Sequence, residues 1–141
     1  MTRWDACQYE SGSMVVELVV LVPLLVLVAL LCVALGRFEM AREQVIGAAR
    51  SGAEAASVMA TASQAEAAAS AAAVPSVFGQ ARACSHLGVR TNVSRYEPGG
   101  SVAVTVACQV SLSDLFVPGV PGVVRVEATE DAPIDPYRVV G

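Results

Sequence analysis

The longest hydrophobic stretch of the 141-residue chain runs from Met14 to Leu35 and contains one charged residue, Glu17, and one proline, Pro23. Sixteen of its 22 residues are Leu or Val. As an α-helix it would be about 33 Å long, enough to cross the hydrocarbon core of a bilayer. The Leu and Val side chains would contribute roughly −5 to −10 kcal/mol to insertion, whereas one carboxylate at the helix centre costs about 2.5 to 3.5 kcal/mol. The pattern therefore predicts a transmembrane helix over residues 13–36 that carries Glu17 into the membrane.

The helical pattern continues beyond Arg37 in an alanine-rich stretch that reaches Val74, directly before Pro75. Alanine is the best helix former, so we expect a helix over residues 37–74. Small residues recur on one side of this helix, at Ala49, Gly52 and Ala56, and would let another helix or a sheet approach closely. The alternative interpretation is a low-complexity helix that is partly frayed, because alanine has little side chain to bury.

From residue 76 onward the hydrophobic period changes to two, which is typical of β-strands. The alternation predicts three strands, at about 88–96, 101–112 and 122–130, with a turn at Pro98-Gly99-Gly100 between the first two. A three-stranded sheet with one apolar face needs a cover, and the alanine-rich helix is available to provide it. We therefore expect an α+β fold in which residues 75–141 form a small β domain with an exposed, extended C-terminal tail.

Two cysteines, Cys84 and Cys108, lie in the predicted β domain, while Cys7 precedes the apolar stretch and Cys32 lies within it. An isolated pair of this kind predicts a disulfide and hence an oxidising compartment, worth on the order of 3 kcal/mol for a loop of this length. Two buried free thiols are the alternative. The arginines that flank the apolar stretch do not orient it clearly, so the cysteines carry the prediction that the β domain is extracytoplasmic.

Charge and composition give no sign of a catalytic, nucleic-acid or metal site. The formal net charge is −4, so no basic surface for nucleic acid is expected. The single histidine, His86, has no CxxC motif to complete a metal site, and we expect it in a surface loop. The acidic group Glu127, Glu130 and Asp131 is interpreted as a solvated strand end. We therefore predict no cofactor, no metal and no enzymatic activity.

Small residues stand before the apolar stretch instead of after it, at Gly12 and Ser13. A secretory signal would have a cleavage site after its apolar core. A cut between Gly12 and Ser13 would make Glu17 the fifth residue of the product. This arrangement resembles the class III signal of type IV pilin-like proteins. With Pro23 six residues after the glutamate and Gly36-Arg37 at the end of the apolar stretch, it is similar to the TadE-like family, the minor pilins or pseudopilins of tight-adherence pilus systems.

The resemblance implies a role for each of these residues. Residues 1–12 would be a leader removed by a prepilin peptidase, Glu17 would set the register between subunits, and Pro23 would kink the helix. The partners would be that peptidase, other pilins or pseudopilins, inner-membrane pilus assembly proteins and membrane lipid. The chain would be a single-pass protein of the cytoplasmic membrane with its C-terminal domain outside, or part of a pilus filament.

A second function class stays open from the residues alone. Glu17 can be a carboxylate tolerated near a helix start, and Pro23 a tolerated transmembrane kink. The protein would then be a single-span signal-anchor protein with a small extracytoplasmic binding domain.

Overall fold

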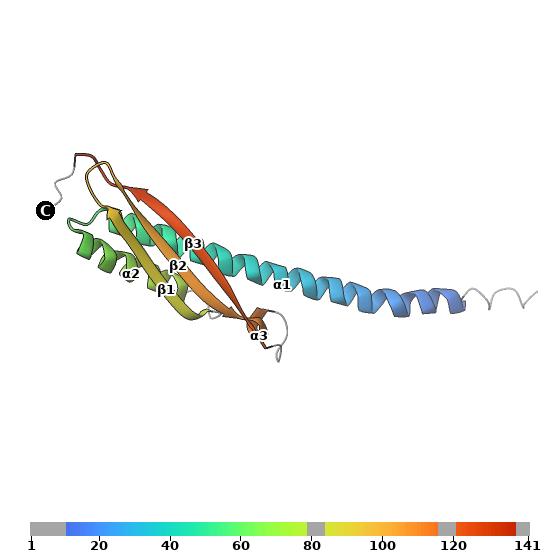
Figure 1. Cartoon of the computed structure of the whole chain (residues 1–141). Helices are drawn as coiled ribbons and strands as arrows, with labels where there is room; N and C mark the ends of the chain where they lie inside the picture. The colour runs from blue at the N-terminus through green and yellow to red at the C-terminus, as the bar shows by residue number, and fades with distance from the viewer. Residues whose placement is uncertain (1–10, 79–83, 116–120, 138–141) are drawn as a thin grey trace, which may run out of the picture. The chain divides into compact units, whose positions relative to one another are not determined.

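The structure is a computed structural model that describes residues 11–78, 84–115 and 121–137. In chain order its elements are the helices α1 (Ser11–Ser57) and α2 (Ala62–Phe78), the strands β1 (Cys84–Arg95) and β2 (Ser101–Ser111), the short helix α3 (Leu112–Leu115), and the strand β3 (Val123–Pro133) (Figure 1). The predicted α+β fold is confirmed: a long N-terminal helix precedes a three-stranded antiparallel sheet of order β1-β2-β3.

The chain divides into two compact units, Met1–Gly36 and Arg37–Gly141. In the first unit, the described part is the apolar half of α1, where the large side chains from Val16 to Leu35 are exposed. The second unit, called the head below, contains the rest of α1, α2 and the sheet. Within the described residues, α1 is the one helix long and apolar enough to cross a membrane.

Strand β2 is central, and its alternation builds the apolar face of the sheet. Val102, Val104 and Val106 have no exposed surface, whereas the residues between them are partly exposed. The three strands pair antiparallel, with Val104 opposite both Thr91 of β1 and Glu130 of β3. The register between β1 and β2 is interrupted between Cys84 and His86 and between Asn92 and Arg95. Helix α2 and the C-terminal half of α1 lie behind this face in Figure 1. We call the face toward the helices the inner face and the other one the outer face.

The helices cover the sheet with alanines. On α2 every fourth residue is fully buried, at Ala65, Ala69, Ala73 and Val77. This spacing places the four side chains in one row along the helix. The expected small-residue face of α1 is confirmed in the same way, because Ala49 and Ala56 have no exposed surface and Gly52 is buried. The head core also includes these residues of α1: Ala41, Val45, Ala48 and Ala53.

The structure differs from the single helix predicted over residues 37–74. Helix α1 ends at Ser57, and α2 begins at Ala62. The Thr61 hydroxyl accepts a hydrogen bond from the Gln64 amide at 3.3 Å, so Thr61 caps α2. The sequence Thr61-Ala62-Ser63-Gln64 has the pattern of a capping box, a helix start signal that accounts for the second helix.

The alanine-rich helix therefore folds into a hairpin of two helices, which buries two small-residue faces instead of one. Across the hairpin, the hydroxyls of Ser51 and Ser76 are 3.3 Å apart. The Tyr96 hydroxyl is a hydrogen-bond donor at the end of α1. It lies 2.8 Å from the Ala56 carbonyl oxygen and 2.7 Å from that of Met59. Unpaired carbonyls at a helix end need such donors.

Pro75 does not end the helix as expected, because α2 continues to Phe78. A proline inside a helix removes the bond to the carbonyl four residues earlier, here that of Ala71. Both Pro75 and Ala71 are exposed, so water can satisfy the free carbonyl.

The C-terminal tail differs from the exposed extension predicted for it. Strand β3 extends to Pro133, and the next residue, Ile134, is only 1% exposed. The Ile134 amide donates to the Gly100 carbonyl at 3.0 Å, and the Gly99 amide donates to the Ile134 carbonyl at 3.2 Å. The predicted turn supplies these groups: Gly99 has a φ of 78°, as the third residue of a type II turn requires, and Gly100 closes the turn onto Glu97 at 2.8 Å. Residues 138–141 of the predicted tail lie outside the described residues.

We expect Gly52→Leu to destabilise the head by about 1 to 3 kcal/mol, because the new side chain overpacks the core. A Cβ atom on Gly52 would already lie 3.1 Å from Val104 Cγ1 and 3.2 Å from the Ala69 carbonyl oxygen. The measurement is chemical unfolding of the full chain in detergent micelles.

The matched control is Gly47→Leu on the same helix, where a Cβ atom would meet nothing within 4 Å. Its stability should stay equal or rise, because leucine has the higher helix propensity. If the Gly52 variant is as stable as the parent chain, the packing around Gly52 accommodates a larger side chain without loss of stability, and the prediction is wrong.

Candidate functional site

Glu17 stands alone as a charged residue in the apolar half of α1. Its side chain is exposed, as are the leucines and valines around it. Among the described residues, the Glu17 carboxylate takes part in no ion pair or hydrogen bond. In a bilayer such a carboxylate would be costly without a partner, and the partner would have to come from another molecule or from the N-terminal end of the helix.

The predicted processing site lies at the start of the same helix. Helix α1 begins at Ser11, so Gly12 and Ser13 belong to its first turn. Residues four apart on a helix are neighbours, with Cβ atoms about 5 to 6 Å apart. An amine created at Ser13 would therefore be one turn from the Glu17 carboxylate. Residues 1–10 of the predicted leader lie outside the described residues.

Pro23 lies within α1, which continues to Ser57. It borders a shallow apolar hollow of about 450 Å³ together with Leu18, Val19 and Val22. At 3.6 residues per turn, Pro23 is about 120° around the helix from Glu17, and the other three residues also lie away from the carboxylate. The helix thus presents its carboxylate on one side and an apolar hollow on another.

Cys84 and Cys108 form the predicted disulfide, with their Cα atoms 5.6 Å apart. Cys108 points to the inner face of β2 and is 2% exposed. By simple alternation along β1, Cys84 would share the outer face with His86. A register irregularity between Cys84 and His86 places one extra residue, Ser85, in β1. This β-bulge turns Cys84 inward, which makes the bridge geometrically accessible.

The Ser85 hydroxyl donates to the Gln109 carbonyl at 2.9 Å, so the bulge is tied to β2. The extra residue also leaves His86 on the outer face, opposite Gln109. His86 is therefore a strand residue and not the loop residue predicted, although its exposure was predicted correctly.

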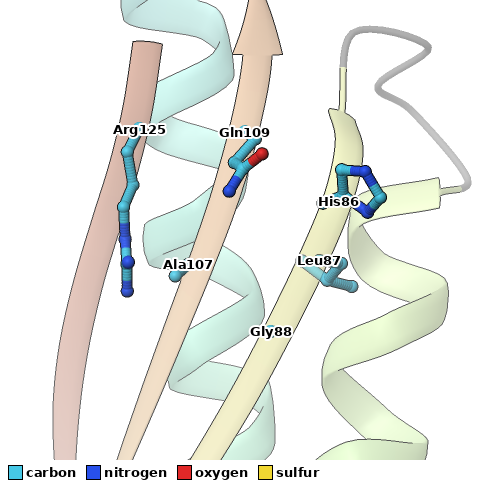
Figure 2. A pocket seen from close by; sticks show the side chains of 6 residues that line it. All are labelled: His86, Leu87, Gly88, Ala107, Gln109 and Arg125. Atoms are coloured by element: carbon cyan, nitrogen blue, oxygen red, sulfur yellow. The ribbon is translucent and has the colours of Figure 1, made fainter. Parts of the chain in front are cut away.

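The outer face carries a row of polar side chains at this level. His86 pairs with Gln109, and Gln109 pairs with Arg125 of β3. These three residues border a shallow hollow of about 480 Å³ that is floored by Gly88 and Ala107 (Figure 2). The Arg125 guanidinium is 2.9 Å from the Glu127 carboxylate. The sequence carries no local signal for this row, because its members come together only through strand pairing.

The acidic residues Glu127, Glu130 and Asp131 lie on strand β3. Glu127 and Asp131 are exposed on the outer face, while Glu130 is half-buried. Within the described residues, no group of three side chains is arranged to hold a metal ion.

The structure thus brings Cys84 and Cys108 together and places Gly12, Ser13, Glu17 and Pro23 on one helix. Comparison with known proteins adds one finding for this helix. The family model described as TadE-like protein matches residues 12–54, from the predicted processing site to the last turn of α1. No curated protein and no solved structure matches the chain. The segment formed by residues 12–54, with Glu17 and Pro23 in it, is therefore TadE-like.

Proposed function

We propose that the protein is a minor pilin or pseudopilin of a tight-adherence pilus, anchored by α1 in the cytoplasmic membrane with the head on the outer side. The observation that carries the proposal is the TadE-like match, which begins at Gly12 and includes Glu17 as the lone charge in an apolar helix. A pilus-related protein of this kind is structural, so no catalytic residue is assigned.

The proposed mechanism begins with cleavage by a prepilin peptidase between Gly12 and Ser13. Before the cut, the Ser13 nitrogen is a neutral amide. After the cut it is an ammonium group, one helical turn from the Glu17 carboxylate. Two opposite charges at a few ångströms attract each other far more strongly in a low-dielectric layer than in water. Cleavage would thereby supply the partner that Glu17 lacks.

In an assembly, the Glu17 carboxylate of an incoming subunit would meet the Ser13 ammonium of its neighbour. A buried ion pair adds little net stability, because both charges lose their hydration. It discriminates strongly between registers, because a misplaced helix leaves both charges unpaired in lipid. We infer that Glu17 sets the axial register, and that other pilus subunits and inner-membrane assembly proteins are the partners.

The cleavage step is tested by the N-terminus of the mature protein. Intact mass measurement of the chain extracted from membranes should give a product that begins at Ser13. Gly12→Val should leave the full-length chain, because a larger side chain stands at the cut. Gly36→Val, at the other end of the apolar stretch, is the matched control and should be cleaved normally. A mature parent chain that retains residues 1–12 would favour the signal-anchor alternative.

The orientation of the head is tested through its cysteines. If the head reaches an oxidising compartment, Cys84 and Cys108 should resist thiol labelling of the denatured, unreduced protein and react after reduction. Cys32 is a free, exposed thiol on α1 and provides an internal positive control. Labelling of both Cys84 and Cys108 without reduction would contradict the proposed location.

The role of Glu17 is tested by Glu17→Val and Glu17→Gln. Removing the charge makes the helix more apolar, so both variants should stay in the membrane fraction or enter it more completely. They should be lost from assemblies, because the Ser13 ammonium of the neighbour is left unpaired. The measurement is co-purification with pilus components, with Glu66→Gln in the head as the charge-matched control. If Glu17→Val assembles as well as the parent chain, the register mechanism is wrong.

A further inference from the structure

The outer face of the sheet is lined by small side chains at its centre. Gly88, Ala107 and Thr105 lie there, between the rows of longer side chains. A Cβ atom built on Gly88 would meet a single described atom, the Ala107 carbonyl oxygen at 4.0 Å. Figure 2 shows the Arg125 side chain extending along β3 toward the level of Ala107, beside the hollow. This face thus has an open floor bordered by the Arg125 guanidinium, which is paired with Glu127 of the same strand.

The side of α1 that faces away from the sheet has the complementary features. Met40 is 68% exposed, and Glu43 is exposed one turn further along. Gly47 has open space at its Cβ position. A hollow of about 390 Å³ is bordered here by Glu43, Gln44, Gly47 and Ser76, among others.

Glu43 differs from its acidic neighbours on α1 in having no basic partner. Glu39 is 3.8 Å from Arg42, and Glu54 is 3.0 Å from Arg50. In the part of the chain that the structure describes, Glu43 is in no ion pair or hydrogen bond. Its carboxylate is therefore available to a cation from another molecule.

The two surfaces lie at the same level along the head. Gly52 of α1 is opposite Val104 of β2, and the Tyr96 bond to Ala56 shows that α1 runs toward the start of β2. From Gly52 back to Glu43 is nine helical residues, about 13 to 14 Å. The same distance along β2 from Val104 is about four residues and reaches Cys108. Glu43 is thus level with the rows that contain Arg125 and Ala107, on the opposite side of the head.

We propose that a second copy of this chain docks sideways, with its α1 surface on the outer sheet face of the first copy. The Arg125 guanidinium of one copy enters the hollow beside Gly47 and binds the Glu43 carboxylate of the other. Met40 lies on the floor formed by Gly88 and Ala107. The inference depends on the proposed pilus role in one respect: both copies are anchored in the same membrane.

Two physical points select a second copy as the occupant. First, the complementary charges and hollows are on opposite sides of one molecule at one level, so the contact forms by lateral translation. Translation keeps every α1 parallel, which copies inserted in one membrane require. Second, such a contact joins two different surfaces and leaves one of each free, so it can be repeated without closing.

The guanidinium group has enough donors for this arrangement. One Arg125 nitrogen, Nη2, is used by Glu127 of the same strand. The group carries five N–H donors in a planar fork, so others can bind a second carboxylate. Glu127 holds the side chain along β3 and thereby presents it at the level of the partner surface.

The experiment uses two tagged versions of the full chain in membranes, both with Cys7→Ser and Cys32→Ser. One carries Met40→Cys and the other carries Gly88→Cys, and the readout is the disulfide-linked heterodimer. Glu43→Arg is then added to the first version, or Arg125→Glu to the second, or both. The matched control is Glu66→Arg in the first version with Arg50→Glu in the second, which reverses exposed charges outside the contact between the two versions.

We expect the heterodimer in the starting pair, a loss of about tenfold with either single reversal, recovery with both reversals, and no change in the control. Absence of the heterodimer in the starting pair would overturn the proposal. The proposal would also be overturned if the heterodimer yield stayed the same after a single charge reversal. It would equally be overturned if the two reversals together did not restore the yield. Because uncleaved copies can form the same contact, a failure of the cleavage test leaves this readout intact.

Discussion

The head depends on the close approach of two alanine-rich helices to a valine-rich central strand. Alanine and glycine contribute little apolar area per residue, so the contact is stabilised by close packing over a long interface instead of by large side chains. Gly52 marks where α1 meets both α2 and β2, at distances that leave no room for a Cβ atom without adjustment. The helix hairpin follows from this constraint, because only a fold back at Val58–Thr61 lets both small-residue faces contact the sheet.

The connection between helices and sheet is controlled by a single inserted residue. Ser85 shifts the alternation of β1, so that Cys84 faces the core and reaches Cys108, while His86 stays on the outer face beside Gln109. The bulge therefore serves the covalent bridge on one face and sets the polar row on the other.

The two units of the chain differ in how far their apolar side chains are buried and their charged groups are paired. In the described part of the head, every buried side-chain polar atom has a hydrogen-bond partner, and an apolar core lies between the helices and the sheet. In the apolar half of α1, leucines and valines are exposed and one carboxylate has no partner among the described residues. A bilayer would cover the exposed leucines and valines, and the proposed cleavage or a neighbouring subunit would supply a cation for the carboxylate. The proposed pilus role answers both requirements with the same residues, Ser13 and Glu17.

The sequence by itself determined the features that depend on local pattern. The apolar helix with Glu17 and Pro23, the strand alternation from Val102 to Val110, the Pro98-Gly99 turn and the cysteine pair were all predictable, because period, turn chemistry and residue type act over a few positions. The TadE-like resemblance was also readable, since its residues lie on one continuous helix. Tertiary structure decided the rest. Thr61 begins a second helix and Pro75 is tolerated in it because buried alanines on two faces favour a hairpin, and Ile134 is buried because the β1–β2 turn offers it two backbone partners. The row of His86, Gln109 and Arg125 exists only once three strands are in register, since residues distant in sequence have no local signal for lying side by side.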